Sequence, residues 1–138
     1  MDLKRGISYA VLLWLLIFVA ISIIMFAAPI TIQNALHFIV VPLLVLSCAG
    51  LYFKTEIASP SEGLKLGIIF LIVGTILDIA ITIPLFIKSF AAFYTWDLFV
   101  GLAETIIFSV IAGKLYEKKP ELILAKKPKA KAKKKKKK

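Results

Sequence analysis

The stretch LKLGIIFLIVGTILDIAITIPLFI, residues 64–87, decides the fold of this chain. A helix crosses the hydrocarbon core of a bilayer with about 20 predominantly apolar residues, and this stretch is long enough. Beyond Lys65 at its start, its one charged residue is Asp78. A charge at mid-bilayer is disfavoured by at least ~2.5–3.5 kcal/mol on insertion scales, so an acid at this position is a candidate functional residue.

Three more stretches have the same apolar character, and hydrophobic residues make up 60% of the chain. Soluble domains have about 45–50% by a similar count. The sequence therefore predicts an all-α, polytopic membrane protein with one domain over residues 1–116 and four transmembrane helices arranged as two antiparallel hairpins. The predicted spans are approximately residues 8–28, 34–53, 64–87 and 93–116.

Two prolines add local detail to the third span. Ser59, Pro60 and Glu62 match a capping box with proline at the first helical position, so this helix is expected to begin near Pro60, before the membrane. Pro84 removes a backbone donor and frees the carbonyl of Ala80. A kink there would open the outer half of the helix, although transmembrane helices also tolerate proline for structural reasons.

The distribution of basic residues predicts the orientation. An even number of spans puts the lysine-rich C-terminus on the same side as most of the other basic residues, and only Lys88 falls on the opposite side. The positive-inside rule then predicts a multi-pass protein of the cytoplasmic membrane with both termini in the cytoplasm. The basic residues on that side are Lys4, Arg5, Lys54, Lys65 and Lys114, and the interfacial aromatic residues on the other are Phe90, Phe93, Tyr94 and Trp96.

Small residues recur on the third and fourth spans. Such residues allow two helix backbones to approach closely in a membrane, and hydroxyl groups can hydrogen-bond across the gap. The first span has no comparable pattern, because Ser8, Trp14 and Ser22 do not form a polar stripe. The residues expected to pack helices together are Gly67, Gly74, Gly101, Ser109 and Gly113.

The fourth span contains a second acid, Glu104. If the turn between the last two spans centres near Ala91, Asp78 and Glu104 are each thirteen residues from it and lie at similar depth. If Thr95 instead caps a helix that starts later, Glu104 is shallower. A helix face that carries small and acidic residues is expected to point into the bundle, because lipid cannot solvate the acidic groups.

The two acids support two hypotheses. In the first, Asp78 and Glu104 form a proton or cation site for coupled transport, supported by the polar groups of Thr75, Thr82, Thr105 and His37. In the second, both stay protonated and hydrogen-bond between helices, which suits a structural or scaffolding protein. For His37, near the outer boundary, an interfacial histidine with satisfied hydrogen bonds competes with a proton relay.

Other chemistry is not indicated. The sequence has no glycine-rich phosphate loop and no set of Ser, His and Asp residues for nucleophilic catalysis. One histidine and one cysteine, Cys48, do not suggest a transition-metal site. We therefore predict no catalytic residues, no metal and no cofactor.

The C-terminal residues 117–138 form a lysine-rich cytoplasmic tail, with ten lysines among residues 126–138. Like-charge repulsion predicts that this tail is disordered. Beyond the lipid bilayer itself, its expected partners are anionic lipid headgroups. The scaffolding hypothesis adds a tether to lipid, ribosome or nucleoid, with nonspecific nucleic-acid binding through phosphate contacts. The small-residue stripe of the fourth span also suits a homo-oligomer.

Residues 62–113 resemble uncharacterised small four-helix integral membrane proteins of archaea and candidate bacterial phyla. The resemblance lies in Glu62–Gly67, Asp78 with the following Thr82-Ile83-Pro84, Lys88-Ser89-Phe90, and the segment from Asp97 to Glu104. It implies the four-helix architecture and assigns no activity. The chain differs from small multidrug transporters, which place their key acid in the first helix.

Overall fold

The computed structural model of the protein describes residues 2–117, and every secondary-structure element in that range is helical. The third long helix is α-helical as far as Leu77 and π-helical from Asp78 to Ile87. The predicted lysine-rich tail falls, from residue 118 onward, outside the described residues. The elements are α1 (Leu3–Ala27), α2 (Ile30–Phe53), α3 (Pro60–Leu77), η1 (Asp78–Ile87), α4 (Phe90–Phe93) and α5 (Trp96–Leu115).

Four helices in the described part of the chain are long and apolar enough to cross a membrane: α1, α2, the continuous α3–η1 helix and α5. The prediction of an all-helical chain with four such helices is therefore confirmed. The last helix starts at Trp96, with Thr95 in extended conformation before it, and Phe93 belongs to the short α4. The sequence left two possible starts for the last helix, near residue 93 or after Thr95, and the structure has the later one.

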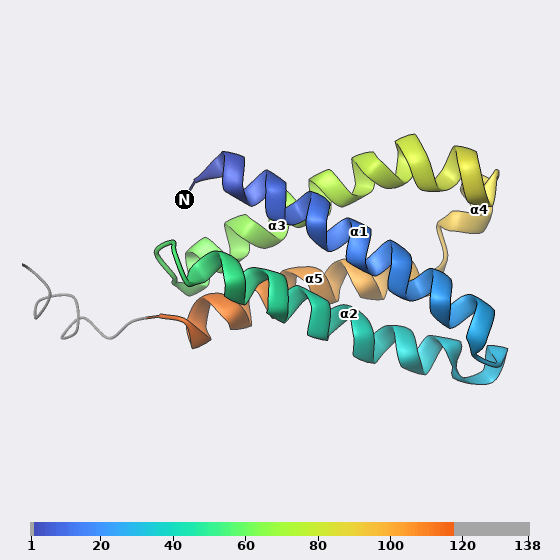
Figure 1. The fold of residues 1–138 in the computed structure, drawn as a ribbon, viewed down its shortest axis with the longest axis horizontal. Helices are drawn as coiled ribbons and strands as arrows, with labels where there is room; N and C mark the ends of the chain where they lie inside the picture. Colours follow the sequence, from blue (N-terminus) through green and yellow to red (C-terminus); the bar gives the residue numbers. More distant parts are fainter. Residues whose placement is uncertain (1, 118–138) are drawn as a thin grey trace, which may run out of the picture.

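Each long helix packs against two others. α1 contacts α2 and α3, and α5 contacts the same two helices from the opposite side of the bundle. Consecutive long helices run in opposite directions along the long axis (Figure 1). One end of the bundle carries Lys4, Arg5, Lys54, Lys65 and Lys114 and is called the basic end. The other carries the 28–29 turn and the segment 88–95 and is called the aromatic end.

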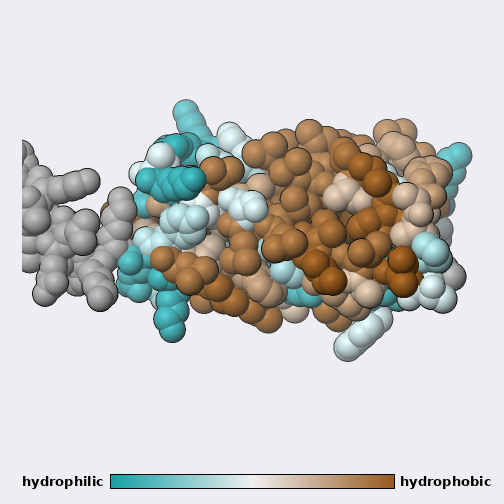
Figure 2. Space-filling model, turned by 60° about the horizontal axis from the view of Figure 1, so that its bottom comes forward, coloured by the Kyte–Doolittle hydropathy of each residue, from teal (hydrophilic) through white to brown (hydrophobic). Residues whose placement is uncertain are grey.

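The distribution of hydrophilic residues on the surface follows this division into a basic end and an aromatic end. On the face that Figure 2 shows, hydrophilic residues gather mainly at the basic end, a few more lie at the aromatic end, and the surface between them is mostly apolar. At the basic end the guanidinium of Arg5 contacts the carboxylate of Glu56 at 3.1 Å, which links α1 to the segment that leads into α3. The Ser59 hydroxyl accepts a hydrogen bond from the Glu62 N–H at 3.1 Å, and Pro60 occupies the first turn of α3.

The tightly packed core lies in the half of the bundle next to the basic end. Large side chains fill it between α1, α2 and α3, and the ring of Tyr9 meets that of Tyr52 edge to face with centroids 5.9 Å apart. In the other half, Ile83 is the one buried hydrophobic residue of η1. The buried core residues are Ala10, Leu13, Val41, Val45, Cys48, Ala49, Tyr52, Phe53, Leu66, Phe70 and Ala112.

Glycines bring the backbones of α3 and α5 together in this packed half. A Cβ on Gly63 would collide with the Ser109 carbonyl oxygen and lie 2.8 Å from the Cα of Val110. A Cβ on Gly113 would collide with the Ser59 carbonyl oxygen. At Gly67 the contact is looser, with the Ile106 Cα at 3.1 Å. Positions 63 and 113 need glycine because the atoms that a Cβ would meet there are backbone atoms, which cannot move aside.

The contact between α3 and α5 does not continue toward the aromatic end. A Cβ on Gly74 would meet no atom within 4 Å, although Gly74 is seven residues from Gly67 and lies on the same face of the helix. In Figure 1 the third helix moves away from α5 as it approaches α4. The main backbone contacts of η1 are accordingly with α3 and α4.

The π winding of η1 accompanies Pro84, which has no N–H to donate and whose ring would clash with an α-helical carbonyl four residues earlier. π turns relieve such conflicts by placing hydrogen bonds five residues apart. The last one joins the Lys88 N–H to the Ile83 carbonyl at 2.6 Å, and Lys88 ends the helix in the left-handed conformation with φ 58°. The predicted local disturbance at Pro84 is thus spread over a segment that begins at Asp78.

We expect Gly63→Ala and Gly113→Ala to destabilise the folded protein by about 1–3 kcal/mol, the usual cost of overpacking. Gly74→Ala serves as the matched control, because its methyl group enters open space and alanine favours a helix by roughly 0.5–1 kcal/mol. Denaturant unfolding in detergent micelles would measure the three variants. Equal stabilities for all three would contradict the close approach of α3 and α5.

Candidate functional site

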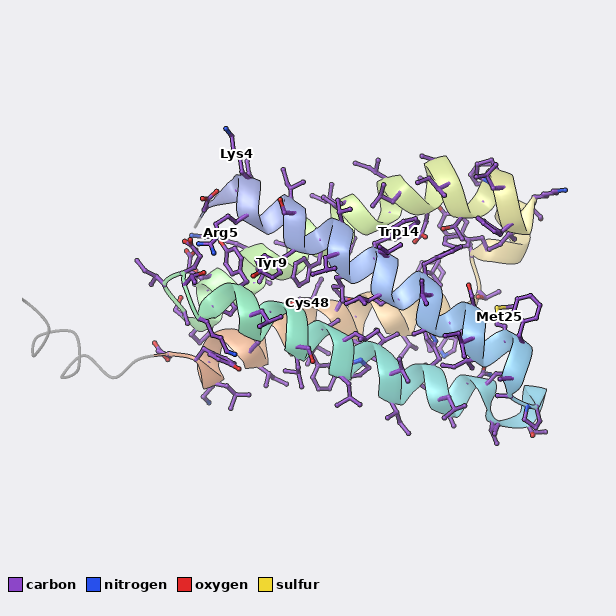
Figure 3. The ribbon with its side chains drawn as sticks, in the orientation of Figure 1. Lys4, Arg5, Tyr9, Trp14, Met25 and Cys48 are labelled. Carbon is purple, nitrogen blue, oxygen red and sulfur yellow. The ribbon has the colours of Figure 1, made fainter. Side chains whose placement is uncertain are left out.

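Asp78 lies at the junction of α3 and η1 and is held by two hydrogen bonds. The indole Nε1 of Trp14, on α1, donates to Oδ1 of Asp78 at 2.8 Å, and the hydroxyl of Thr82 donates to the same oxygen at 2.7 Å. Trp14 lies near the middle of α1 (Figure 3). Both donors serve one oxygen, so Oδ2 receives no hydrogen bond from either of them.

Aromatic rings surround this cluster on the side toward the aromatic end. The rings of Trp14 and Phe18 stack with centroids 5.5 Å apart, and Phe18 meets Phe86 of η1 at 5.1 Å. These rings and the bond between Trp14 and Asp78 connect α1 to η1 through side chains. We call Trp14, Asp78 and Thr82 the Asp78 cluster.

Glu104 occupies a different environment, on α5. Its Oε2 is buried and has no hydrogen-bond partner among the described residues. The neighbouring Thr105 does not serve it, because the Thr105 hydroxyl donates to the Gly101 carbonyl at 2.9 Å. An unpaired buried polar atom costs about 1–3 kcal/mol, so its presence in a folded chain calls for an explanation.

His37 of α2 lies against α5 near the aromatic end. A Cβ on Gly101 would be 3.6 Å from Cε1 and 3.7 Å from Nε2 of the imidazole. Asp97 lies one turn earlier, in the first turn of α5. Asp97, Gly101 and Glu104 lie on one face of α5, because they are separated by four and three residues. This face is directed toward α2, since Gly101 contacts His37.

The two acids are therefore in separate places. Asp78 bonds with α1, across one side of the bundle, and Glu104 lies on the face of α5 directed toward α2, which is on the other side. No hydrogen bond joins the two carboxylates in the part of the chain that the structure describes. The expectation that small and acidic residues share one inward face fits Gly67 and Ser109, which contact each other, but Gly74 has no neighbour and Gly101 contacts His37.

The supporting polar groups also separate. Thr82 bonds with Asp78, Thr105 bonds with its own helix, and the half-buried Thr75 bonds with neither acid. Trp14 is the residue that sequence reasoning missed. A tryptophan in the middle of a span, away from the interfaces where this residue is usual, carries an N–H that needs a partner in lipid, and that signal could have identified it.

A metal site is not formed within residues 2–117. Groups of three or more histidine, cysteine or acidic side chains close enough to bind one ion do not occur among those residues. The arrangement instead offers two carboxylates with contrasting partners. Asp78 receives two hydrogen bonds, whereas no described residue donates to Oε2 of Glu104.

We expect the bond between Trp14 and Asp78 to contribute about 1 kcal/mol to stability, in the range of polar contacts between membrane helices. A double-mutant cycle with Trp14→Phe and Asp78→Leu would measure it by unfolding in micelles. Trp14→Phe should cost more in the wild-type background than in Asp78→Leu. Equal costs in both backgrounds would show that Trp14 acts only by packing on Phe18.

Comparison of this chain with protein-family models, with curated proteins and with solved structures finds no match. The functional argument therefore depends on the chain's own residues and on their geometry.

Proposed function

We propose that this chain is a multi-pass protein of the cytoplasmic membrane that carries protons, or a small cation, through the intramembrane carboxylates Asp78 and Glu104. The observation that carries the proposal is the buried Oε2 of Glu104, which no described group compensates. A carboxyl group in hydrocarbon needs a proton, a cation or hydrogen-bond donors. Where no described residue supplies a donor, a mobile proton or cation can compensate the carboxyl group.

Membrane insertion is supported by the apolar side chains exposed along the middle of the helices. Leu43 is 57% exposed and Ile76 is 59% exposed, and residues like these lie on every long helix. Such a surface is unfavourable in water and suits lipid. The helices then form two antiparallel hairpins, α1 with α2 and α3–η1 with α5. The basic end faces the cytoplasm, together with both termini, as the positive-inside rule favours.

The Asp78 cluster leaves one carboxylate oxygen available to a carried ion. Trp14 and Thr82 both donate to Oδ1, while Oδ2 receives a hydrogen bond from neither and is available to a proton or a cation. Glu104 has the opposite character, because without a donor its charged form depends on what it binds. A proton that moves across the bundle would therefore meet two carboxylates in turn, Asp78 with two hydrogen-bond donors and Glu104 with none among the described residues.

A structural role is the second candidate, and one observation favours it. Both hydrogen bonds to Asp78 come from this chain, and one of them joins α1 to the third helix, as a packing contact would. In this case the carboxylates fix the helix register, and the protein serves as a membrane scaffold whose basic tail binds lipid, ribosome or nucleoid. The tail lies outside the described residues.

Proton flux into liposomes that contain the purified protein separates the two functions. A pH-sensitive dye inside the vesicles would report proton entry driven by a potassium diffusion potential. We expect Asp78→Asn and Glu104→Gln to reduce the rate about tenfold or more, because neutral amides cannot carry a proton. Glu56→Gln is the matched control, since it removes an acid at the basic end, outside the intramembrane site.

Sodium and potassium flux would be measured in the same vesicles, so that a cation carrier is also detected. If the wild-type protein moves neither protons nor these cations faster than protein-free vesicles, the transport proposal fails. If the wild type is active and both amide variants match it, the two carboxylates are not the carriers. The first of these results would favour the scaffold.

A further inference from the structure

We infer that protons reach Glu104 from the aromatic end through the imidazole of His37. This inference rests on the proposed function and assigns a relay residue to it. It is carried by the position of His37 against the bare backbone of Gly101, between two acids on the same face of α5.

The order of the groups along the bundle follows from helix geometry. α2 and α5 both run from the aromatic end to the basic end (Figure 1). His37 lies at the level of Gly101. Asp97 is four residues nearer the aromatic end and Glu104 three residues deeper, which corresponds to about 6 Å and about 4.5 Å along the axis. Steps of this size can be crossed by flexible side chains directly or with one water molecule.

Glycine at position 101 allows this arrangement. The imidazole lies in ordinary van der Waals range of the point where a Cβ would begin, so any side chain longer than a methyl group would occupy the ring's place. The ring therefore rests on α5 in the interval between Asp97 and Glu104.

The proton transfer balances without any other reactant. A neutral imidazole accepts a proton at one nitrogen from water at the aromatic end, and becomes an imidazolium next to Asp97. It then gives the proton from its other nitrogen to Glu104, whose Oε2 has no competing donor among the described residues. The ring returns to the neutral form, and Glu104 becomes a neutral acid.

Few other titratable groups face His37 in the described structure. On α5 they are Asp97 and Glu104. On α2 the other titratable side chains inside the span, Cys48 and Tyr52, are three turns or more deeper, in the packed core. Asp78, on the third helix, is engaged with Trp14 and Thr82 on the far side of the bundle. His37 is also the single histidine of the chain, so its substitution removes all imidazole chemistry.

Chemical rescue tests the relay directly. The full-length His37→Ala protein in liposomes should show proton flux reduced about tenfold relative to wild type. Free imidazole added on the side of the aromatic end should restore most of the rate, because it can enter the vacated space and carry the proton. The same concentration of acetamide, which does not titrate, should restore nothing. Asn34→Ala, one turn nearer the aromatic end on α2, is the matched control and should keep the wild-type rate.

His37→Gln provides a second variant in case the alanine variant folds poorly, since glutamine keeps polarity and bulk without titrating. It should lose flux to the same degree and unfold like the wild type. A wild-type rate in both His37 variants, or a loss that imidazole does not restore, would overturn the relay. If Glu104→Gln still blocks proton flux in that experiment, the proposed function stands without the relay through His37. If the wild type itself conducts nothing, the proposed function fails and the relay fails with it.

Discussion

The backbone contact between α3 and α5 is the constraint on which the rest of the structure depends. In a bilayer, lipid would provide no hydrophobic drive for helices to associate, so close van der Waals packing would have to hold them together. Gly63 and Gly113 provide it by letting each helix touch the other's backbone. The larger side chains of the core fill the space that remains between these helices, α1 and α2.

This contact is confined to one half of the bundle, and that determines where the carboxylates lie. Once α3 is fixed to α5 near the basic end, its continuation diverges, and Gly74 faces open space. Asp78, one turn further, is bound by Trp14 from α1 and not by a residue of α5. Glu104, left on α5, lies on the face directed toward α2. Asp78 and Glu104, which one interpretation of the sequence places at similar depth, therefore lie at two separate sites.

The length of the apolar stretches, the Ser59–Pro60 start of α3 and the small residues of α5 could be recognised in the sequence, because each depends on local chemistry or on helical period. Which helix or side chain each small residue contacts could not be recognised in the sequence. Gly67 and Gly101 look equivalent in the sequence, yet one contacts α5 and the other accommodates the ring of His37. The partner depends on how far two helices diverge, which is a property of the whole bundle.

The π segment is a second feature that the sequence only partly indicated. Pro84 predicts a disturbance near Ala80, but the π winding begins at Asp78. A π turn places more residues in each turn than an α turn does, which changes the direction of every side chain along it relative to α3. The carboxylate of Asp78 sits where this change begins, and its bond to Thr82 spans the first π turn. The irregular winding and the acid are therefore parts of one local structure. In it, the hydrogen bond between Asp78 and Trp14 connects α1 to the third long helix at the point where the winding of that helix changes.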